Sequence, residues 1–299
     1  MPTPKRCVIF NPAAGRGRAQ RRLEALRREW GETVAFRPTQ HSGHATELAR
    51  QAVEDGFELV AAAGGDGTVH EVANGILASP RREVVFGIIP IGSANDYSHS
   101  LQHQFGTPAA GDSARLVDVG HVRDGQGRER FFVCCLGLGL NGRVTLESRR
   151  IRKLRGVALY GLATLRALRD VTAPPLRLQW DEQPTEIVPT LMLSVLLGRR
   201  EGNFVLAPQA ILDDGLFDFV HTGALARWTV LRFLPRLALF GPPPNDPRVH
   251  IGRCRRLRIE SESPLVIHTD GEMFCRPEDD VRQLDIQIQP QRQRVQLFP

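Results

Sequence analysis

A glycine-rich segment follows a short apolar run in the first third of the chain, and its residue types suit phosphate binding. Gly64, Gly65 and Gly67 surround Asp66, and Thr68 follows directly. Glycine lets the backbone approach a bound group closely, and the N–H groups at a helix N-terminus favour phosphate. A carboxylate here would repel phosphate unless a cation lies between them. Asp66 therefore suggests a nucleotide bound with Mg²⁺, which usually takes one or two carboxylates plus substrate phosphates.

The residues on either side of these glycines predict a strand, a loop and a helix. Residues 59–63 form an apolar segment of strand length, and apolar residues between 69 and 77 recur at the spacing of one helix face. Thr68 and Glu71 have the spacing of a capping box, so we expect Thr68 to be the helix N-cap. The glycine loop would then lie at the carboxyl end of a strand.

The same strand-loop-helix order repeats through residues 7–105 and predicts a parallel sheet covered by helices. Ligands of such sheets bind beyond the carboxyl ends of the strands. We therefore expect an α/β nucleotide-binding domain over residues 1–115. Asn11 also suits a plain turn, and Thr39 also suits a helix cap, so these two residues alone do not decide between phosphate binding and local structure. The other loops at this edge carry Asn11, Thr39, Gly92, Ser93 and Asn95.

Beyond residue 116 the pattern changes to shorter apolar segments separated by turns, which predicts a β-rich antiparallel sandwich over residues 116–289. Residues 290–299 are expected to return to the first domain. Residues 146–169 have the pattern of an amphipathic basic helix, and residues 225–240 form a second candidate that Pro235 should interrupt. Such helices suit either anionic lipid head groups or a solvated face over a packed core.

The composition limits the classes of function. The chain has 299 residues, a formal net charge of +6 and only two lysines, so arginine carries the positive charge. Only 6% of residues are aromatic and no basic stripe contains stacking rings, which disfavours nucleic acid binding. Five cysteines show no metal-ligand or disulfide spacing. With no apolar run of transmembrane length, we expect a soluble, cytoplasmic protein.

These motifs resemble those of the diacylglycerol kinase catalytic-domain family, which includes bacterial lipid kinases and sphingosine kinases. Gly64–Thr68 resembles the family signature, although NAD kinases and phosphofructokinases share this pentapeptide. Gly92–Asp96 resembles a lipid kinase motif with Ser93 in place of threonine, and NAD kinases have a different segment there. The segments 213–215 (Asp-Asp-Gly) and 270–272 (Asp-Gly-Glu) also match. The order of the motifs favours the lipid kinase branch.

The resemblance implies a set of site residues. Asp66 and an acid from the second domain, brought to face it across a cleft, would act in catalysis, with the base at either Asp270 or Glu272. Asn141 stands where the family usually has an acid. A structural or regulatory Mg²⁺ would be held by Asp214 and the backbone carbonyls of Ile211 and Leu216. ATP would be bound by Asn11, Thr39, Gly64, Gly65, Asp66, Gly67, Thr68, Gly92, Ser93 and Asn95.

We therefore expect an ATP- and Mg²⁺-dependent kinase that phosphorylates a hydroxyl of a diacylglycerol-like or sphingoid-like lipid. Its expected partners are the lipid substrate, an anionic membrane surface in peripheral contact during turnover, and a second copy of the chain in a homodimer; nucleic acid is not among them. Two alternatives remain at this point. One is a soluble NAD-kinase-like enzyme, and the other is a non-catalytic homologue that binds lipid or nucleotide.

Overall fold

The computed structural model describes residues 5–14, 18–31, 34–108, 113–151, 154, 156–169, 172–243 and 245–298. The chain divides into two compact units. Unit 1 consists of Met1–Asp118 and Gln291–Pro299, and unit 2 consists of Val119–Pro290. The sequence predicts boundaries at residues 115/116 and 289/290. None of the described helices is long and apolar enough to cross a membrane.

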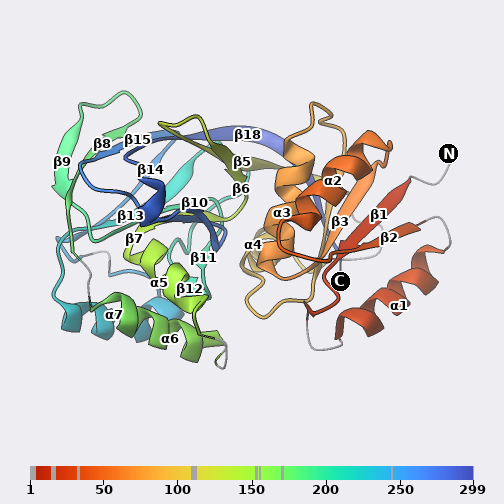
Figure 1. The fold of residues 1–299 in the computed structure, drawn as a ribbon, viewed down its shortest axis with the longest axis horizontal. Helices are drawn as coiled ribbons and strands as arrows, with labels where there is room; N and C mark the ends of the chain where they lie inside the picture. Colours follow the sequence, from red (N-terminus) through yellow and green to blue (C-terminus); the bar gives the residue numbers. More distant parts are fainter. Residues whose placement is uncertain are drawn as a thin grey trace. The chain divides into compact units, whose positions relative to one another are not determined.

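Unit 1 contains a parallel sheet in the order β2-β1-β3-β4, with the C-terminal part of β18 beside β4 (Figure 1). Helix α1 covers one face and packs Leu23 and Leu26 against Val8 and Ala61, while α2 and α3 lie side by side on the other. The predicted parallel sheet with covering helices is therefore confirmed. The elements are β1 (Arg6–Phe10), α1 (Arg18–Trp30), β2 (Val34–Pro38), α2 (His44–Glu54), β3 (Leu59–Gly64), α3 (Asp66–Leu77), β4 (Val85–Pro90) and α4 (Asp96–Phe105). The strands β5 (Arg115–Asp124) and β18 (Gln283–Leu297) each have residues in both units.

Strand β18 belongs to both units. Its residues 294–297 pair in parallel with 85–88 of β4, and Phe298 donates its N–H to Ile88. Phe298 also packs edge-on against Trp30 of α1 with ring centroids 4.8 Å apart. Residues 283–287 of the same strand pair antiparallel with β15 in unit 2. The C-terminal segment therefore does complete the sheet of unit 1.

Unit 2 is built mainly from antiparallel strands. One sheet has the strand order β14-β13-β10-β7-β16-β17. In addition, β15 pairs with β18 on one side and with β8 on the other, and β8 pairs with β9. This confirms the predicted β-rich second domain. Its elements are β6 (Glu129–Phe132), β7 (Cys135–Gly139), α5 (Leu140–Ser148), α6 (Gly156–Ala167), β8 (Pro175–Trp180), β9 (Glu186–Pro189), β10 (Met192–Leu196), β11 (Arg200–Glu201), β12 (Phe204–Val205), β13 (Phe217–Thr222), α7 (Arg227–Leu239), β14 (Val249–Cys254), β15 (Arg256–Ser261), β16 (Ile267–Thr269), β17 (Glu272–Cys275) and the 3₁₀ turn η2 (Pro277–Asp279).

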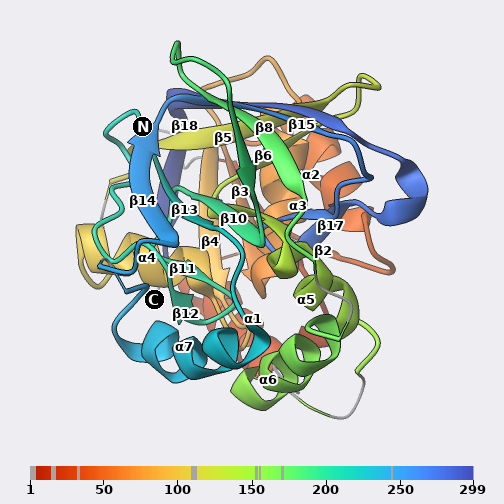
Figure 2. The same ribbon diagram turned by 90° about the vertical axis from the view of Figure 1, so that its left-hand side faces the viewer.

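The helices of unit 2 differ from the sequence prediction. The expected single helix over 146–169 is wrong, because α5 ends at Ser148 and α6 begins at Gly156. Conversely, α7 continues through Pro235. A proline removes one helical hydrogen bond, but Val230 and Leu231 before it and Leu237 after it are packed in apolar clusters of unit 2. Figure 2 shows α6 and α7 next to each other, and both contribute to one of these clusters.

The contact between α2 and α3 depends on Gly75. A Cβ atom there would lie 2.4 Å from the carbonyl oxygen of Thr46 and 2.6 Å from Cβ of Ala49. Both distances are too short for normal packing, so the missing side chain allows the two helices to approach. Gly161 in α6 is also helical, but a Cβ atom there would meet nothing within 4 Å.

These two glycines should respond in opposite directions to the same substitution. Gly161→Ala should stabilise the protein by about 0.5–1 kcal/mol, because alanine has the higher helix propensity. Gly75→Ala should destabilise it by about 1–3 kcal/mol, because overpacking exceeds that gain. Thermal unfolding of both variants measures the difference. An unchanged or higher Tm for Gly75→Ala would contradict the close packing of α2 on α3.

Candidate active site

The loops at the carboxyl edge of the unit 1 sheet are hydrogen-bonded to one another. The N–H of Thr39 donates to the carbonyl of Phe10 at 2.9 Å, and the N–H of Asn11 donates to Ala63 at 3.3 Å. The N–H groups of Ile91 and Gly92 both donate to the carbonyl of Gly64, at 2.9 and 3.1 Å. The structure therefore brings the predicted phosphate-site segments of unit 1 to one edge, as a parallel sheet requires.

The glycines of this edge are required by close backbone approach. A Cβ atom on Gly92 would lie 2.5 Å from Cα of Gly65, and one on Gly64 would lie 2.4 Å from the Thr68 hydroxyl oxygen. The first N–H groups of α3, which begins at Asp66, have no intrahelical acceptor. A glycine cradle beside such a helix N-terminus fits a phosphate group.

The Asp66 carboxylate joins two of these loops. Its Oδ2 accepts the N–H of Asn95 at 2.9 Å, and its Oδ1 accepts the N–H of Asp96 at 2.8 Å. Asn95 adopts a left-handed backbone conformation with φ of 50°, and its side-chain amide donates to the carbonyl of Gly92 at 3.0 Å. The negative charge thus lies on the N-terminus of α4, where helix electrostatics favour it. Asp66 therefore holds the 92–96 loop in place, a role that the sequence did not predict.

The capping box predicted for Thr68 and Glu71 is wrong. Helix α3 begins three residues earlier than predicted, at Asp66, with Gly65 in place of Thr68 as its N-cap. The Glu71 carboxylate instead accepts the N–H groups of Gly43 at 2.8 Å and Ala45 at 3.1 Å, so it caps the start of the neighbouring helix α2. Spacing alone cannot reveal this, because the two helices are brought together by tertiary packing.

The other predicted ATP residues differ in what their side chains do. Asn11 forms the expected side-chain turn, since its Oδ1 accepts the N–H of Ala13 at 2.9 Å. Ser93 is exposed and Thr39 is half-buried at this edge. Gly15 and Gly17, which the sequence suggests keep the Asn11 loop open, lie outside the described residues.

In unit 2, the segment Asp270-Gly271 forms the tight turn between β16 and β17. Both residues have positive φ, 50° and 79°, as a two-residue type I′ hairpin requires. The Asp270 carboxylate accepts the N–H groups of Val133 at 3.1 Å, Cys134 at 2.8 Å and Cys135 at 3.0 Å. The negative charge of this buried carboxylate is thus stabilised by backbone N–H groups. Asp270 anchors the turn to the start of β7.

Glu272, the other candidate base, is the more accessible acid. Its side chain is 30% exposed and forms an ion pair with Arg149 from the end of α5. Arg130 lies near both acids and donates to the carbonyl of Met273 at 2.8 Å. Burial lowers the pKa of Arg130, and the Glu272 and Asp270 carboxylates oppose that shift. Neither Arg149 nor Arg130 was predicted as a site residue; only Arg149 lies in the predicted basic segment 146–169.

The predicted Mg²⁺ loop at residues 211–216 contains an arginine contact. The Asp214 carboxylate accepts the N–H of Leu216 at 3.1 Å and forms an ion pair with Arg253 of β14. Arg253 also lies 3.7 Å from Asp218, whose pKa is raised by burial. In this arrangement the residues fit a guanidinium and not a metal ion. A Mg²⁺ ion held by Asp214 and the carbonyls of Ile211 and Leu216 stays a prediction that requires Arg253 to move.

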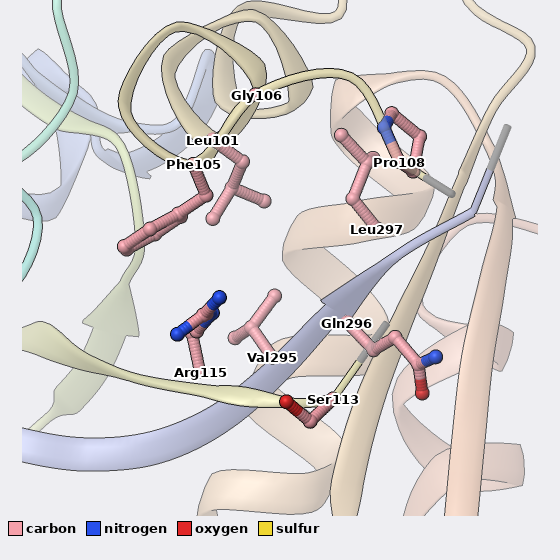
Figure 3. A pocket seen from close by; sticks show the side chains of 9 residues that line it. All are labelled: Leu101, Phe105, Gly106, Pro108, Ser113, Arg115, Val295, Gln296 and Leu297. Atoms are coloured by element: carbon pink, nitrogen blue, oxygen red, sulfur yellow. The ribbon is translucent and has the colours of Figure 1, made fainter. Parts of the chain in front are cut away.

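Two cavities lie outside the predicted sites. One of about 60 Å³ in unit 1 lies between the end of α4 and the C-terminal part of β18, lined by Leu101, Phe105 and Val295 (Figure 3). It has room for a few water molecules but not for a nucleotide. The other, of about 440 Å³, lies in unit 2 beside the stacked rings of Trp180 and Phe219.

The fold of the whole chain matches that of solved diacylglycerol kinase structures. A crystal structure described as a diacylglycerol kinase from Bacillus anthracis has a TM-score of 0.72 at 19% identity, with 100% of this chain and 98% of that chain covered. Another solved chain from the same organism gives a TM-score of 0.77 at 21% identity. The parallel unit and the β-rich unit together therefore define a diacylglycerol kinase-like fold.

Sequence comparison identifies the family. Residues 5–124 match the family model for the diacylglycerol kinase catalytic domain, and residues 135–296 match the YegS C-terminal NAD kinase beta sandwich-like domain. A protein named diacylglycerol kinase from Staphylococcus carnosus is 30% identical over 279 residues, covering 89% of this chain and 87% of the relative. The protein of that name from Bacillus subtilis is 27% identical over 281 residues, covering 89% and 88%. The chain belongs to the diacylglycerol kinase family and is an enzyme of the lipid kinase class.

The two hydrogen bonds of Asp66 lead to a prediction about Asp66→Ala. Without the carboxylate, the N–H groups of Asn95 and Asp96 lose their acceptors, which should destabilise the protein by about 1–3 kcal/mol. The 92–96 loop should also move, so binding of Mg-ATP should weaken. Thermal unfolding and isothermal titration with Mg-ATP measure the two effects. Asp55→Ala, which removes an acid paired with Arg37 in the same unit, serves as the control. Unchanged stability and unchanged nucleotide affinity for Asp66→Ala would contradict this role.

Proposed function

We propose that this protein uses ATP and Mg²⁺ to phosphorylate a hydroxyl group of diacylglycerol or a similar lipid. The observation that carries the proposal is the set of hydrogen-bonded loops at one edge of the unit 1 sheet, where Gly64, Gly65 and Gly92 let the loops pack closely beside the N-terminus of α3. Family membership supports the lipid acceptor, because the relatives are named diacylglycerol kinase.

Unit 1 would hold the nucleotide through its backbone. The first N–H groups of α3 and the glycine loop would bind phosphate oxygens, with Asn11, Thr39 and Ser93 beside them. Bound ATP supplies the phosphoryl group, and Mg²⁺ at its phosphates offsets their negative charge. Asp66 would act mainly by fixing the 92–96 loop. Because the transition state of phosphoryl transfer is loose, such positioning accounts for much of the catalysis.

Glu272 is the base that the geometry favours. A general base must reach the hydroxyl proton of the acceptor with a free lone pair. Asp270 is 8% exposed and accepts three backbone N–H groups, whereas the Glu272 side chain is 30% exposed and pairs only at the surface with Arg149. We therefore assign proton transfer to Glu272 and anchoring of the turn to Asp270.

The first test is transfer of labelled γ-phosphate from Mg-ATP into diacylglycerol, sphingosine and NAD in separate reactions. We expect label in diacylglycerol. Glu272→Gln should lower kcat by about 10²–10⁴-fold, the usual contribution of a general base, with little change in Tm. Asp270→Asn should lower Tm as well, because its side chain can no longer accept from all three backbone N–H groups.

Glu129→Gln is the matched control, because Glu129 is a surface acid of the same unit paired with Arg123 at 3.0 Å. It should leave kcat unchanged. Full activity of Glu272→Gln would remove Glu272 from the mechanism. Label in NAD alone would support the NAD-kinase-like alternative, and label in sphingosine alone would change the acceptor class.

We also propose that α6 and α7 contact an anionic membrane surface. Trp228 is 77% exposed at the start of α7, and Leu165 is 51% exposed on α6. Arg166 in α6 and the exposed Arg232 and Arg236 in α7 belong to the same pair of helices. Exposed tryptophan with nearby arginine suits the interface between head groups and acyl chains. A homodimer stays a prediction.

The substitution Trp228→Ser should weaken binding to vesicles that contain anionic phospholipid and lower turnover of vesicle-bound diacylglycerol. Turnover of a short-chain, dispersed diacylglycerol should change little, because that substrate needs no membrane contact. Sedimentation with vesicles and the two activity assays measure this. Ile187→Ser is the control, since Ile187 is 60% exposed on β9 of the same unit, away from α6 and α7. Equal effects of the two substitutions would contradict the proposed surface.

A further inference from the structure

A buried histidine and a buried glutamate lie behind the turn that carries Glu272. Nε2 of His268 in β16 lies 2.9 Å from Oε1 of Glu201 in β11, and the two side chains are 2% and 10% exposed. Neither residue is among the predicted site residues. His268 lies two residues before Asp270, the first residue of the turn, whereas Glu201 belongs to a separate short hairpin formed by β11 and β12.

The other ring nitrogen of His268 holds the turn itself. The N–H of Gly271 donates to Nδ1 of His268 at 3.2 Å. Because Nδ1 accepts this hydrogen bond, the ring proton lies on Nε2, which then donates to Glu201. Glu201, His268 and the Gly271 backbone thus form one continuous chain of hydrogen bonds. It ends at the residue directly before Glu272.

The neighbouring strand leaves space for this pair. Gly137 of β7 lies opposite His268 in the sheet. A Cβ atom on Gly137 would lie 2.3 Å from Nε2 of His268 and 2.6 Å from Oε1 of Glu201. Any other residue at position 137 would therefore displace the pair. Gly137 therefore leaves room for the His268 and Glu201 side chains, which its position in a strand alone does not indicate.

Burying the Glu201 and His268 side chains costs free energy, so the pair is not an efficient way to stabilise the fold. Oε2 of Glu201 is buried and has no hydrogen-bond partner among the described residues. A buried acid with an unsatisfied oxygen costs free energy, and well-packed apolar residues often serve stability equally well. The geometry of the turn gives the pair another use, because the Asp270 carboxylate fixes one side of the turn and His268 fixes the other.

We propose that Glu201 and His268 are positioning residues for Glu272. Glu201 fixes the tautomer and orientation of the His268 ring, the ring holds the Gly271 N–H, and the turn then directs Glu272 toward the acceptor hydroxyl. This inference rests on the proposed function of Glu272 as the base. Loss of Glu201 should lower kcat, because a small displacement of a catalytic group reduces the rate strongly, while binding of Mg-ATP stays as it is.

The test compares Glu201→Ala, Glu201→Gln and a matched control in the full-length protein. Thr190→Val is the control, because Thr190 makes a buried hydrogen bond to His221 at 3.0 Å, and His221 lies in β13, separated from β16 by β10 and β7. Four quantities are measured for each variant: kcat and KM in the diacylglycerol assay, Tm, and the rate of hydrogen exchange at the Gly271 N–H.

Glu201→Ala should lower kcat by about 10–100-fold with KM for ATP nearly unchanged, and should speed exchange at Gly271. Glu201→Gln should restore most of kcat and slow exchange, because the glutamine oxygen can still accept from Nε2 of His268. Thr190→Val should lower Tm to a similar degree as Glu201→Ala but leave kcat and Gly271 exchange close to wild type.

The proposal is overturned if Glu201→Ala and Thr190→Val lower kcat equally, or if Gly271 exchange is the same in Glu201→Ala and wild type. A wild-type protein that transfers no phosphate to lipid would instead refute the proposed function. In that case Gly271 exchange still decides whether Glu201 and His268 hold the turn.

Discussion

Hydrogen bonds from backbone N–H groups to buried or half-buried carboxylates hold both candidate sites together. Asp66 receives two such bonds from the start of α4, Glu71 receives two from the start of α2, and Asp270 receives three from the start of β7. Each acid thereby satisfies donors that no helix or strand could satisfy at that point. The loops proposed to bind phosphate and the turn that carries Glu272 take their shape from these contacts. The carboxylates of Asp66 and Asp270, which the sequence suggests as catalytic groups, thus serve at least partly to hold the surrounding backbone in its conformation.

Much of the architecture could be predicted because it depends on local patterns. The apolar runs that end in Phe10, Ala63 and Pro90, each followed by polar or glycine-rich residues, correctly predicted the parallel sheet and the edge at which its loops meet. The helix limits failed where tertiary packing decides them. Glu71 caps a neighbouring helix instead of its own, and α7 passes through Pro235 because apolar residues on both sides are packed.

Residues of the candidate site could be predicted only where they belong to one continuous sequence motif. Residues 64–68 and 270–272 are continuous motifs, so both were visible in the sequence, although only the glycine turn of 64–68 was predicted as a turn. The contacts of Glu201 with His268, of Arg149 with Glu272 and of Arg253 with Asp214 join segments far apart in the chain. None has a sequence signature, because an isolated Glu or Arg in a β-rich region is most often a surface residue. These long-range contacts distinguish Asp270 from Glu272, which the motif itself does not.

Strand β18 has residues in both units, and this affects the order in which the protein can fold during synthesis. On the ribosome, β4 emerges well before its partner residues 294–297, because the whole of unit 2 lies between them in the sequence. Until then the edge of β4 exposes unpaired N–H and C=O groups, a state that invites pairing with other chains. Unit 1 therefore cannot complete its sheet until unit 2 has been synthesised, even though β1 to β4 are already present. Its protection from aggregation depends on how quickly the rest of the chain follows.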